Sequence, residues 1–313
     1  MNKVLIADSV SSAVSEVFDK NGIAYDTKIG LSEDELATEI TEYSGLIVRS
    51  AVTVTEKIIN SAINLKVIGR PGVGVDNVDL KAATNNGIVV MNTPLGNVQA
   101  TAELTFGIMH SLMRKISNAN QSMHQKKWEK KKFIGNEMYG KTIGIIGFGN
   151  IGKKVSQIAH AYGMNVLVYS ASISPEDEKK FNVTNQSIDD ILEGADIITF
   201  HNKLSENSKY LINSNAITKM KKNAIIINCA RGGLVNEKDI KEALEKGNIA
   251  GYGCDVYENE PEQDSIFSSM DNVVMTPHIG ASTIEAQEKV AYQIAEQIVE
   301  FLKNKKIINQ VNK

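Results

Sequence analysis

The sequence predicts an α/β protein with two lobes, each built on a parallel β-sheet. Two observations lead to this prediction. Short runs rich in Val and Ile alternate with amphipathic stretches from the first residues onward, a pattern that indicates parallel strands joined by helical crossovers. A second series of the same kind begins near residue 142 and contains a glycine-rich turn. A chain of 313 residues is long enough for about two domains of ordinary size.

The first series is expected to form one α/β unit. Its buried strands are predicted over residues 3–7, 45–49, 65–69 and 88–91, and its helices over 11–20, 33–41, 55–62 and 77–85. Ser32 and Glu35 show the Ser-x-x-Glu pattern of a capping box at the start of the second helix. Gly22 and Gly87 follow helices at positions where a left-handed residue commonly ends a helix.

The second series begins after a long helix and a polar segment. The helix is predicted over 97–115 from the spacing of Val98, Ala102, Phe106, Met109 and Met113. A lysine-rich stretch at 126–132 is expected to form a solvated arm. Strands are predicted over 142–146, 165–169, 196–200, 224–229, 249–255 and 272–276, with helices over 151–162 and 283–303. One domain is therefore expected over 98–282 and the other over 1–97 plus 283–313.

Composition excludes several classes of protein. Acidic residues outnumber Lys and Arg by 37 to 34, so binding of nucleic acid through bulk charge is not expected. The two cysteines, Cys229 and Cys254, form no Cys-x-x-Cys pair and have no His at zinc-ligand spacing, which predicts neither a disulfide framework nor a metal site. No apolar run approaches the length of a membrane span. A cytoplasmic protein is the expected outcome.

The glycine-rich turn predicts a dinucleotide site. Gly147, Gly149 and Gly152 form a Gly-x-Gly-x-x-Gly motif between a predicted strand and a predicted helix. In such a turn the glycines allow a tight bend, close approach of a pyrophosphate, and packing of helix on strand. The helix N-terminus adds N–H groups for the phosphates. The next strand ends in Ser170 instead of the usual acidic residue, so the choice between NAD and NADP stays open.

Three later strands end in groups suited to hydride-transfer chemistry. Arg231, Glu260 and His278 each follow a predicted strand, and the carboxyl ends of parallel strands gather at one edge of a sheet. A His can take the proton of an alcohol, a carboxylate can orient the His and raise its pKa, and an Arg can bind a substrate carboxylate through two hydrogen bonds. Singly, each also fits an ordinary role as an ion-pair partner, a solvated charge or a hydrogen-bonded loop residue. His201 also ends a strand on the side of the glycine turn.

These motifs resemble those of the D-isomer-specific 2-hydroxyacid dehydrogenases over essentially the whole chain. The family pattern is carried by GFGNIG, NCARGGLVNE, DVYENEP and PHIGAST. The strings GRPGVGVDNVDL, MNTPLGN, WEKKKFIGNEMYGKTIGIIG and GASTIEAQ are similar to members that act on 3-phosphoglycerate. The resemblance implies two Rossmann-like lobes, with a cofactor lobe inserted into a flavodoxin-like substrate lobe and the active site between them.

The resemblance also implies roles for individual residues. His278 would be the acid/base, Glu260 its partner, and Arg231 the group that binds the substrate carboxylate. Substrate contacts are implied for Arg49, Ser50, Val73, Gly74, Arg231 and His278, together with Lys130 from the second subunit of a homodimer. Cofactor contacts are implied for Gly147, Gly149, Asn150, Ile151, Gly152, Ser170, Asn202, Cys229, Ala230, Asp255, Gly280 and Ala281.

The expected activity is oxidation of 3-phosphoglycerate to 3-phosphohydroxypyruvate in serine biosynthesis, with NAD as cofactor and NADP left open by Ser170. A small phosphorylated 2-hydroxy acid is the expected partner, without nucleic acid or membrane. The regulatory domains that extend some relatives are expected to be absent. Two alternatives remain. One is a glyoxylate or hydroxypyruvate reductase that prefers NADPH, which Ser170 favours, and the other is a corepressor-like protein that senses NAD(H).

Overall fold

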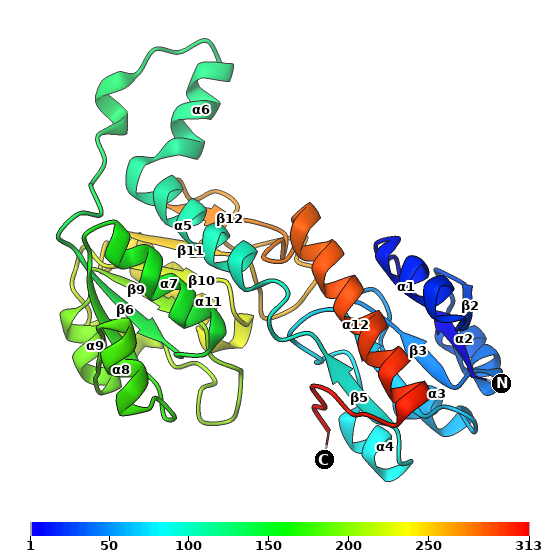
Figure 1. Cartoon of the computed structure of the whole chain (residues 1–313). Coiled ribbons are helices and arrows are strands. Elements are labelled where there is room, and N and C mark those ends of the chain that lie inside the picture. The colour runs from blue at the N-terminus through cyan, green and yellow to red at the C-terminus, as the bar shows by residue number, and fades with distance from the viewer. Residues whose placement is uncertain (1, 313) are drawn as a thin grey trace. The chain divides into compact units, whose positions relative to one another are not determined.

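The computed structural model describes residues 2–312 and divides into two compact units. The first unit contains the chain up to Val98 and again from Ala281 onward, and the second unit is Gln99–Gly280. From the sequence, the boundaries were expected after residues 97 and 282. The domain expected over 1–97 plus 283–313 begins at residue 1 and ends at residue 313, and these two residues lie outside the described ones. Each unit is a sheet covered by helices (Figure 1).

The sheet of the first unit has five parallel strands in the order β2-β1-β3-β4-β5. This flavodoxin-like order confirms the fold class expected for this lobe. The strands are β1 Lys3–Ile6, β2 Ala24–Thr27, β3 Gly45–Ile47, β4 Val67–Arg70 and β5 Val89–Asn92. β2 is not predicted from the sequence, because its residues are exposed or half-buried and form no apolar run.

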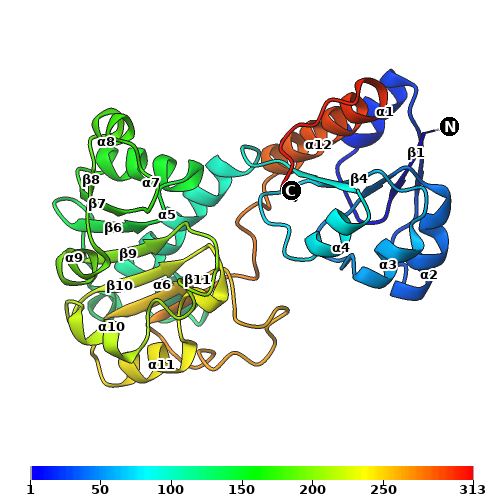
Figure 2. The same cartoon turned by 90° about the horizontal axis from the view of Figure 1, so that it is seen from below.

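Helices cover both faces of this sheet (Figure 2). One face carries α2 Glu33–Glu39, η1 Ile40–Glu42, α3 Glu56–Ser61 and α4 Leu80–Asn85, and the other carries α1 Ala13–Asn21 and α12 Ile284–Asn304. The capping box of Ser32 and Glu35 is confirmed at the start of α2. Gly69 in β4 allows α12 to approach the sheet, since a Cβ atom there would lie 2.7 Å from both Ile294 and Ile298.

The chain after α12 closes one edge of the first sheet. Gln310 forms an antiparallel bridge with Met91 in β5. The Asn312 side chain continues this pairing: its Oδ1 accepts from the N–H of Val90 at 2.7 Å, and its Nδ2 donates to the carbonyl of Ile88 at 2.8 Å. The backbone of an edge strand that would otherwise face solvent is thereby paired.

The sheet of the second unit has seven parallel strands in the order β12-β11-β10-β9-β6-β7-β8. If β6 is taken as the first strand, the strands from β8 to β11 follow the Rossmann order 3-2-1-4-5-6, and β12 is one further strand at that edge. This confirms the Rossmann-like lobe expected from the sequence. The strands are β6 Thr142–Ile146, β7 Asn165–Tyr169, β8 Thr184–Asn185, β9 Ile197–Phe200, β10 Ile225–Asn228, β11 Gly251–Cys254 and β12 Val273–Met275. Both α5 Val98–Arg114 and α7 Asn150–Ala161 pack on one face, and α9 Ile188–Gly194, α10 Ser214–Lys219 and α11 Glu237–Glu245 pack on the other.

Several short helices of the second unit were not anticipated: α8 Pro175–Phe181, the three helices α9, α10 and α11, and the single turn η3 Gly232–Leu234. Each of the four α-helices begins after a side chain that caps its first turn. The capping residues are Ser174, Ser187, Asn213 and Asn236. Ser and Asn at these positions are typical of helix N-termini and could have predicted where the helices begin, whereas apolar runs alone do not.

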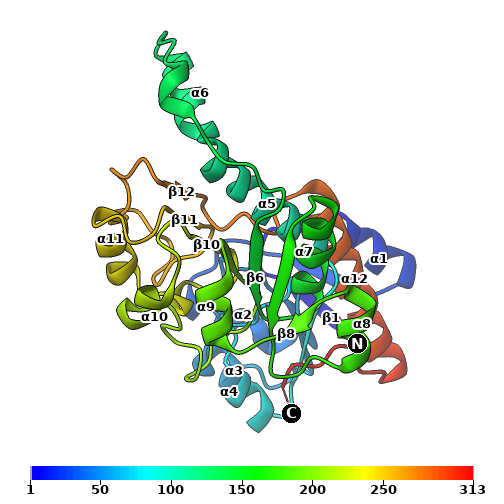
Figure 3. The same ribbon diagram turned by 90° about the vertical axis from the view of Figure 1, so that its left-hand side faces the viewer.

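The lysine-rich stretch belongs to an arm, defined here as residues 115–136. It contains α6 Ile116–His124 and η2 Lys130–Phe133, and it projects from the body of the second unit (Figure 3). The N–H of Asn136 donates to the carbonyl of Met113 at 2.8 Å, so the arm leaves and rejoins the unit at one place. Within residues 2–312, the helices are all too short or too polar to cross a membrane.

Candidate active site

The glycine turn of the second unit lies where β6 meets α7. Gly147 has φ 98, and a Cβ atom there would lie 2.5 Å from the amide nitrogen of Asn202. At Gly152 a Cβ atom would lie 2.1 Å from the carbonyl oxygen of Gly147. Gly149, in contrast, has open space on its Cβ side. Two glycines are therefore required by packing, while the third leaves room for a ligand to approach the backbone.

Two polar atoms beside this turn lack partners among residues 2–312. These are Oδ1 of Asn202 and Nδ1 of His201, and both are buried. The other ring nitrogen of His201 lies 3.1 Å from the hydroxyl of Thr199, and burial lowers the pKa of this His to about 3, so its ring is neutral. Buried polar groups usually have hydrogen-bond partners, so these two atoms fit a site that takes a polar ligand. Together with the glycine cradle, the residues present fit a dinucleotide.

Ser170 follows β7 and is held by Asn185 at the end of β8. The N–H of Ser170 donates to Oδ1 of Asn185 at 3.0 Å, and the Asn185 amide group donates back to the carbonyl of Ser170 at 3.3 Å. Lys153 in α7 is already paired with Asp177 of α8 at 2.7 Å. The end of β7 thus presents a hydroxyl where an acidic residue would exclude a 2′-phosphate.

The structure brings together the three residues that follow β10, β11 and β12. Nδ1 of His278 donates to Oε2 of Glu260 at 2.5 Å. This hydrogen bond raises the pKa of His278, and burial acts against it. Burial acts to raise the pKa of Glu260, but hydrogen bonds from His278 and from the N–H of Tyr257 leave that pKa below its usual value. The contact therefore favours the ionised form of Glu260 and makes the His278 ring more basic.

Arg231 lies within electrostatic reach of this pair. Its positive charge acts to lower the pKa of both Glu260 and His278. Asn228, which is fully buried, holds the turn that carries Arg231: its Nδ2 donates to the carbonyl of Arg231 at 2.8 Å and its Oδ1 accepts from the N–H of Ala230 at 3.1 Å. The neighbouring Cys229 is buried, which raises its pKa to about 12 and makes its thiol unreactive.

Asp255 holds the turn that carries His278, a role that was not predicted from the sequence. Its oxygens accept from the hydroxyl of Thr276 at 2.6 Å and from the N–H groups of Ile279 and Gly280 at 2.7 Å each. Burial raises the pKa of Asp255, although these three hydrogen bonds act against it. The side chain is 1% exposed. The sequence offered one indication of this role, because the apolar strand predicted over 249–255 ends in Asp255. A buried carboxylate requires several hydrogen-bond donors close to it.

The first unit places its expected substrate residues at the carboxyl ends of β3 and β4. The N–H of Arg49, which follows β3, donates to Oδ2 of Asp8 at 2.9 Å, and Ser50 comes next in the chain. Val73 and Gly74 follow β4, and the Val73 carbonyl accepts from the Asn92 side chain at 2.6 Å.

A second arginine at this edge was missed from the sequence. Arg70 is the last residue of β4, and its Nε donates to Oδ1 of Asn77 at 2.9 Å. The Asn77 amide group in turn donates to the carbonyl of Arg49 at 2.5 Å. The rule that selected the other candidates, a charged residue at the end of a buried strand, also selects Arg70.

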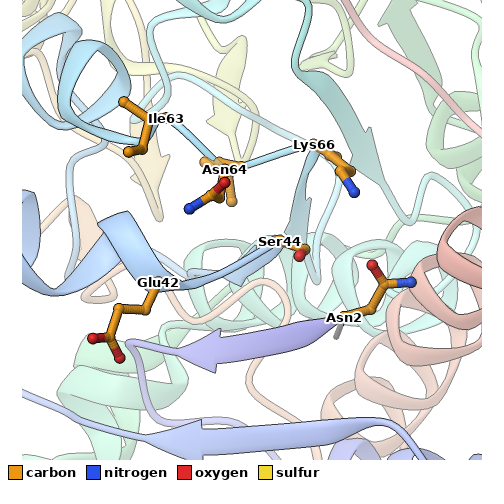
Figure 4. Close-up of a pocket in the computed structure, with 7 residues that line it drawn as sticks. Asn2, Glu42, Ser44, Ile63, Asn64 and Lys66 are labelled. Atoms are coloured by element: carbon orange, nitrogen blue, oxygen red, sulfur yellow. The ribbon is translucent and has the colours of Figure 1, made fainter.

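Lys130 is exposed in η2 of the arm. Ala281 directly follows Gly280 and is the first residue of the returning segment of the first unit. A pocket of about 420 Å³ in the first unit is lined by Asn2, Glu42, Ser44, Ile63, Asn64, Leu65 and Lys66 (Figure 4). It lies at the amino ends of β1, β3 and β4, opposite to the edge where parallel sheets bind ligands. In residues 2–312, no three His, Cys, Asp or Glu side chains are grouped to hold a metal ion.

Comparison with known proteins identifies the family of the second unit. Residues 106–280 match the family described as "D-isomer specific 2-hydroxyacid dehydrogenase, NAD binding domain". D-3-phosphoglycerate dehydrogenase of Bacillus subtilis (strain 168) is 42% identical over 314 residues, which cover 100% of this chain and 59% of that protein. The chain therefore spans little more than half the length of this curated relative.

Solved structures give the same result over the full chain. The TT0316 protein from Thermus thermophilus matches with a TM-score of 0.91 and 30% identity, covering 99% of each chain. The NAD+-bound 3-phosphoglycerate dehydrogenase of Entamoeba histolytica matches with a TM-score of 0.84 and 28% identity, covering 100% of this chain and 99% of that one. The matched residues 106–280 lie within the second unit, which is thus an NAD-binding domain. The chain belongs to the D-isomer specific 2-hydroxyacid dehydrogenase family.

Proposed function

We propose that this protein oxidises 3-phosphoglycerate to 3-phosphohydroxypyruvate with NAD, the reaction named for its relatives. The observation that supports the proposal best is the 2.5 Å hydrogen bond between His278 and Glu260, next to Arg231 and in the same unit as a dinucleotide cradle. A 2-hydroxy acid presents two groups to such a site, a carboxylate for an arginine and a hydroxyl for a base.

His278 is the proposed general base. Because Nδ1 is bonded to Glu260, Nε2 is the ring nitrogen that would take the proton of the substrate hydroxyl. The imidazolium so formed is stabilised by the adjacent carboxylate, which is the physical meaning of its raised pKa. Arg231 would hold the substrate carboxylate through the fork of its guanidinium. A bound NAD supplies the hydride acceptor.

We assign the cofactor contacts on the same grounds. The N–H groups at the start of α7, at Asn150 and Ile151, would face the pyrophosphate across the glycine turn. Asn202 offers a buried acceptor without a partner in residues 2–312. The other proposed contacts, which remain as expected from the sequence, are Gly147, Gly149, Gly152, Ser170, Cys229, Ala230, Asp255, Gly280 and Ala281.

The first unit supports recognition of a phosphate. Arg49 follows β3 and Arg70 ends the neighbouring strand β4, at the same edge of the sheet. The Asn77 side chain joins them, because it accepts from the Arg70 guanidinium and donates to the backbone carbonyl of Arg49. Arginine is well suited to bind a phosphate dianion because its planar fork makes two hydrogen bonds to the oxygens. We propose that this edge, with Ser50 and the backbone of Val73 and Gly74, binds the substrate.

We also propose that the protein is a homodimer joined through the cofactor units, with Lys130 of the arm near the site of the second copy. The arm and the surface near its base carry large exposed apolar side chains, including Trp128 at 81%, Ile134 at 76% and Tyr139 at 79%. Large apolar side chains exposed on a protein surface are typical of an interface. Light scattering coupled to size exclusion tests this, and a monomer at micromolar concentration would contradict it.

The proposed activity is tested with a substrate panel and the His278→Ala variant. We expect 3-phosphoglycerate to be oxidised faster than unphosphorylated 2-hydroxy acids. Removing a general base should lower kcat by ~10²–10⁴-fold while NADH binding, measured by fluorescence, stays unchanged. Near-normal turnover of the variant would contradict the role of His278.

A second candidate, reduction of glyoxylate or hydroxypyruvate with NADPH, is favoured by one observation, the hydroxyl of Ser170 at the end of β7. The same panel, run with NADPH, separates the two. Faster turnover of glyoxylate than of the phosphorylated substrates would support this candidate instead.

A further inference from the structure

Tyr257, three residues after β11, contacts all three segments that carry the proposed catalytic groups. Its backbone lies against Gly232, where a Cβ atom would be 1.9 Å from the Tyr257 carbonyl carbon. Its N–H donates to Oε1 of Glu260 at 3.0 Å. Its hydroxyl donates to the carbonyl of Thr276 at 2.9 Å, two residues before His278. One residue therefore links the segments of Arg231, Glu260 and His278.

The Thr276 carbonyl is the acceptor that shapes the turn of His278. It accepts the N–H of His278 at 3.0 Å as well as the hydroxyl of Tyr257. His278 has φ 52, a left-handed conformation that costs free energy in a residue with a Cβ atom and persists where its surroundings hold it. The Tyr257 hydroxyl thus acts on the peptide that fixes the position of the His278 ring.

We propose that Tyr257 is a positioning residue that fixes Glu260 through its N–H and His278 through its hydroxyl. The inference rests on the proposed function, in which His278 moves the substrate proton. The ring of Tyr257 packs against the core of the second unit, so a phenylalanine would keep this packing. It would lose the hydroxyl's bond to the Thr276 carbonyl and its contact with the Cys254 thiol. Burial raises the pKa of Tyr257, which keeps its phenol protonated and able to donate at every pH of interest.

The test is the Tyr257→Phe variant of the full chain, compared with the wild type in two measurements. Loss of one hydrogen bond of ordinary strength, about 1 kcal/mol, should lower kcat by ~5-fold, with KM for NAD unchanged. The pKa of His278, followed by NMR of ¹³C-labelled histidine, should fall. Glu260 and Asp255 raise this pKa and Arg231 lowers it, so a looser contact with Glu260 shifts the balance downward. The resonance is assigned by its absence in His278→Ala.

Tyr210→Phe is the matched control. The Tyr210 hydroxyl donates to Oε2 of Glu258 at 3.0 Å, one residue from Tyr257, but bonds to no group of the segment 276–280. We expect this variant to leave kcat and the His278 pKa unchanged. Equal effects of the two variants would show a general loosening of the loop and would overturn the proposal.

An unchanged His278 pKa and unchanged kcat in folded Tyr257→Phe would also overturn it. If that variant does not fold, as judged by thermal unfolding, Tyr257→Met removes the hydroxyl with a flexible apolar side chain and gives the same comparison. The NMR titration requires no substrate. If wild-type protein does not oxidise 3-phosphoglycerate, the proposed function fails, while the pKa comparison still decides the role of Tyr257.

Discussion

Nδ1 of His278 and Oε2 of Glu260 lie 2.5 Å apart, although 18 residues separate them and each follows a different strand. The contact exists because β11 and β12 are neighbours in a parallel sheet and end at the same edge. Neither residue lies on a regular element, so their geometry depends on the loops that carry them.

Replacing Glu260 with Gln should shift the pH dependence of oxidation. The hydrogen bond to the carboxylate raises the pKa of His278, so its loss lowers that pKa. Since the neutral ring is the form that accepts the proton, the decline of kcat/KM on the acidic side should move to lower pH, while the plateau rate falls. A pH profile measured from pH 5 to 9 checks this, and an acidic limb that moves upward would contradict the pairing.

Replacing Arg231 with Lys should impair both turnover and substrate affinity. A lysine keeps the charge but lacks the planar fork, so it cannot form two parallel hydrogen bonds with a carboxylate. Steady-state kinetics with one 2-hydroxy acid and saturating NAD give kcat and KM separately. The dissociation constant of NADH is the control, because the glycine turn that would bind it lies after a different strand. If Arg231→Lys had the same kcat and KM as the wild type, bidentate binding of the substrate carboxylate by Arg231 would be excluded.

Replacing Arg49 with Ala should affect phosphorylated substrate most. If this side chain binds the phosphate, kcat/KM for 3-phosphoglycerate falls by ~10–100-fold, the range for loss of a charge-assisted hydrogen bond. An unphosphorylated 2-hydroxy acid should be much less affected. Arg70→Ala is expected to behave in the same way, since Arg70 and Arg49 follow neighbouring strands at the same edge of the sheet. Equal losses on both substrates would place the two arginines outside the phosphate site.

Ser170 predicts weak discrimination between NAD and NADP. A serine carries no charge, so it neither repels a 2′-phosphate nor forms an ion pair with it. The ratio of kcat/KM values should therefore stay below ~30-fold, or about 2 kcal/mol. Ser170→Asp should shift this ratio toward NAD by suppressing the use of NADP, because two negative charges would then meet. Kinetics with both cofactors, for wild type and variant, provide the measurement. A wild-type preference above a thousandfold would show that other contacts control the choice.

Apart from β2 and β8, the strands of both sheets followed from local sequence, and so did the choice of the proposed catalytic groups. β6 and β7 begin and end where their apolar runs do, and the strand-end rule selected Arg231, Glu260 and His278. The rule works because the end of a strand can be predicted from local sequence, and in a parallel sheet the carboxyl ends of all strands lie at the same edge.

The contacts that orient these groups did not follow from local sequence. The bonds of Asp255 to Gly280 and of Tyr257 to Thr276 join residues about twenty positions apart. They depend on how the loops after β11 and β12 pack against each other, which periodicity does not describe. The short polar strand β2 was missed for a related reason: its place is fixed by pairing with β1, and not by its own apolar pattern.

The packing of α12 against the first sheet has a consequence for the order in which the protein forms during synthesis. The second unit is continuous in sequence and emerges from the ribosome before α12 does. Until α12 emerges, one face of the first sheet, including Ile47 and Val67, is covered by α1 alone. The amino-terminal segment is therefore made first and finished last, and its uncovered apolar face is the part of the nascent chain most exposed to aggregation or chaperone binding.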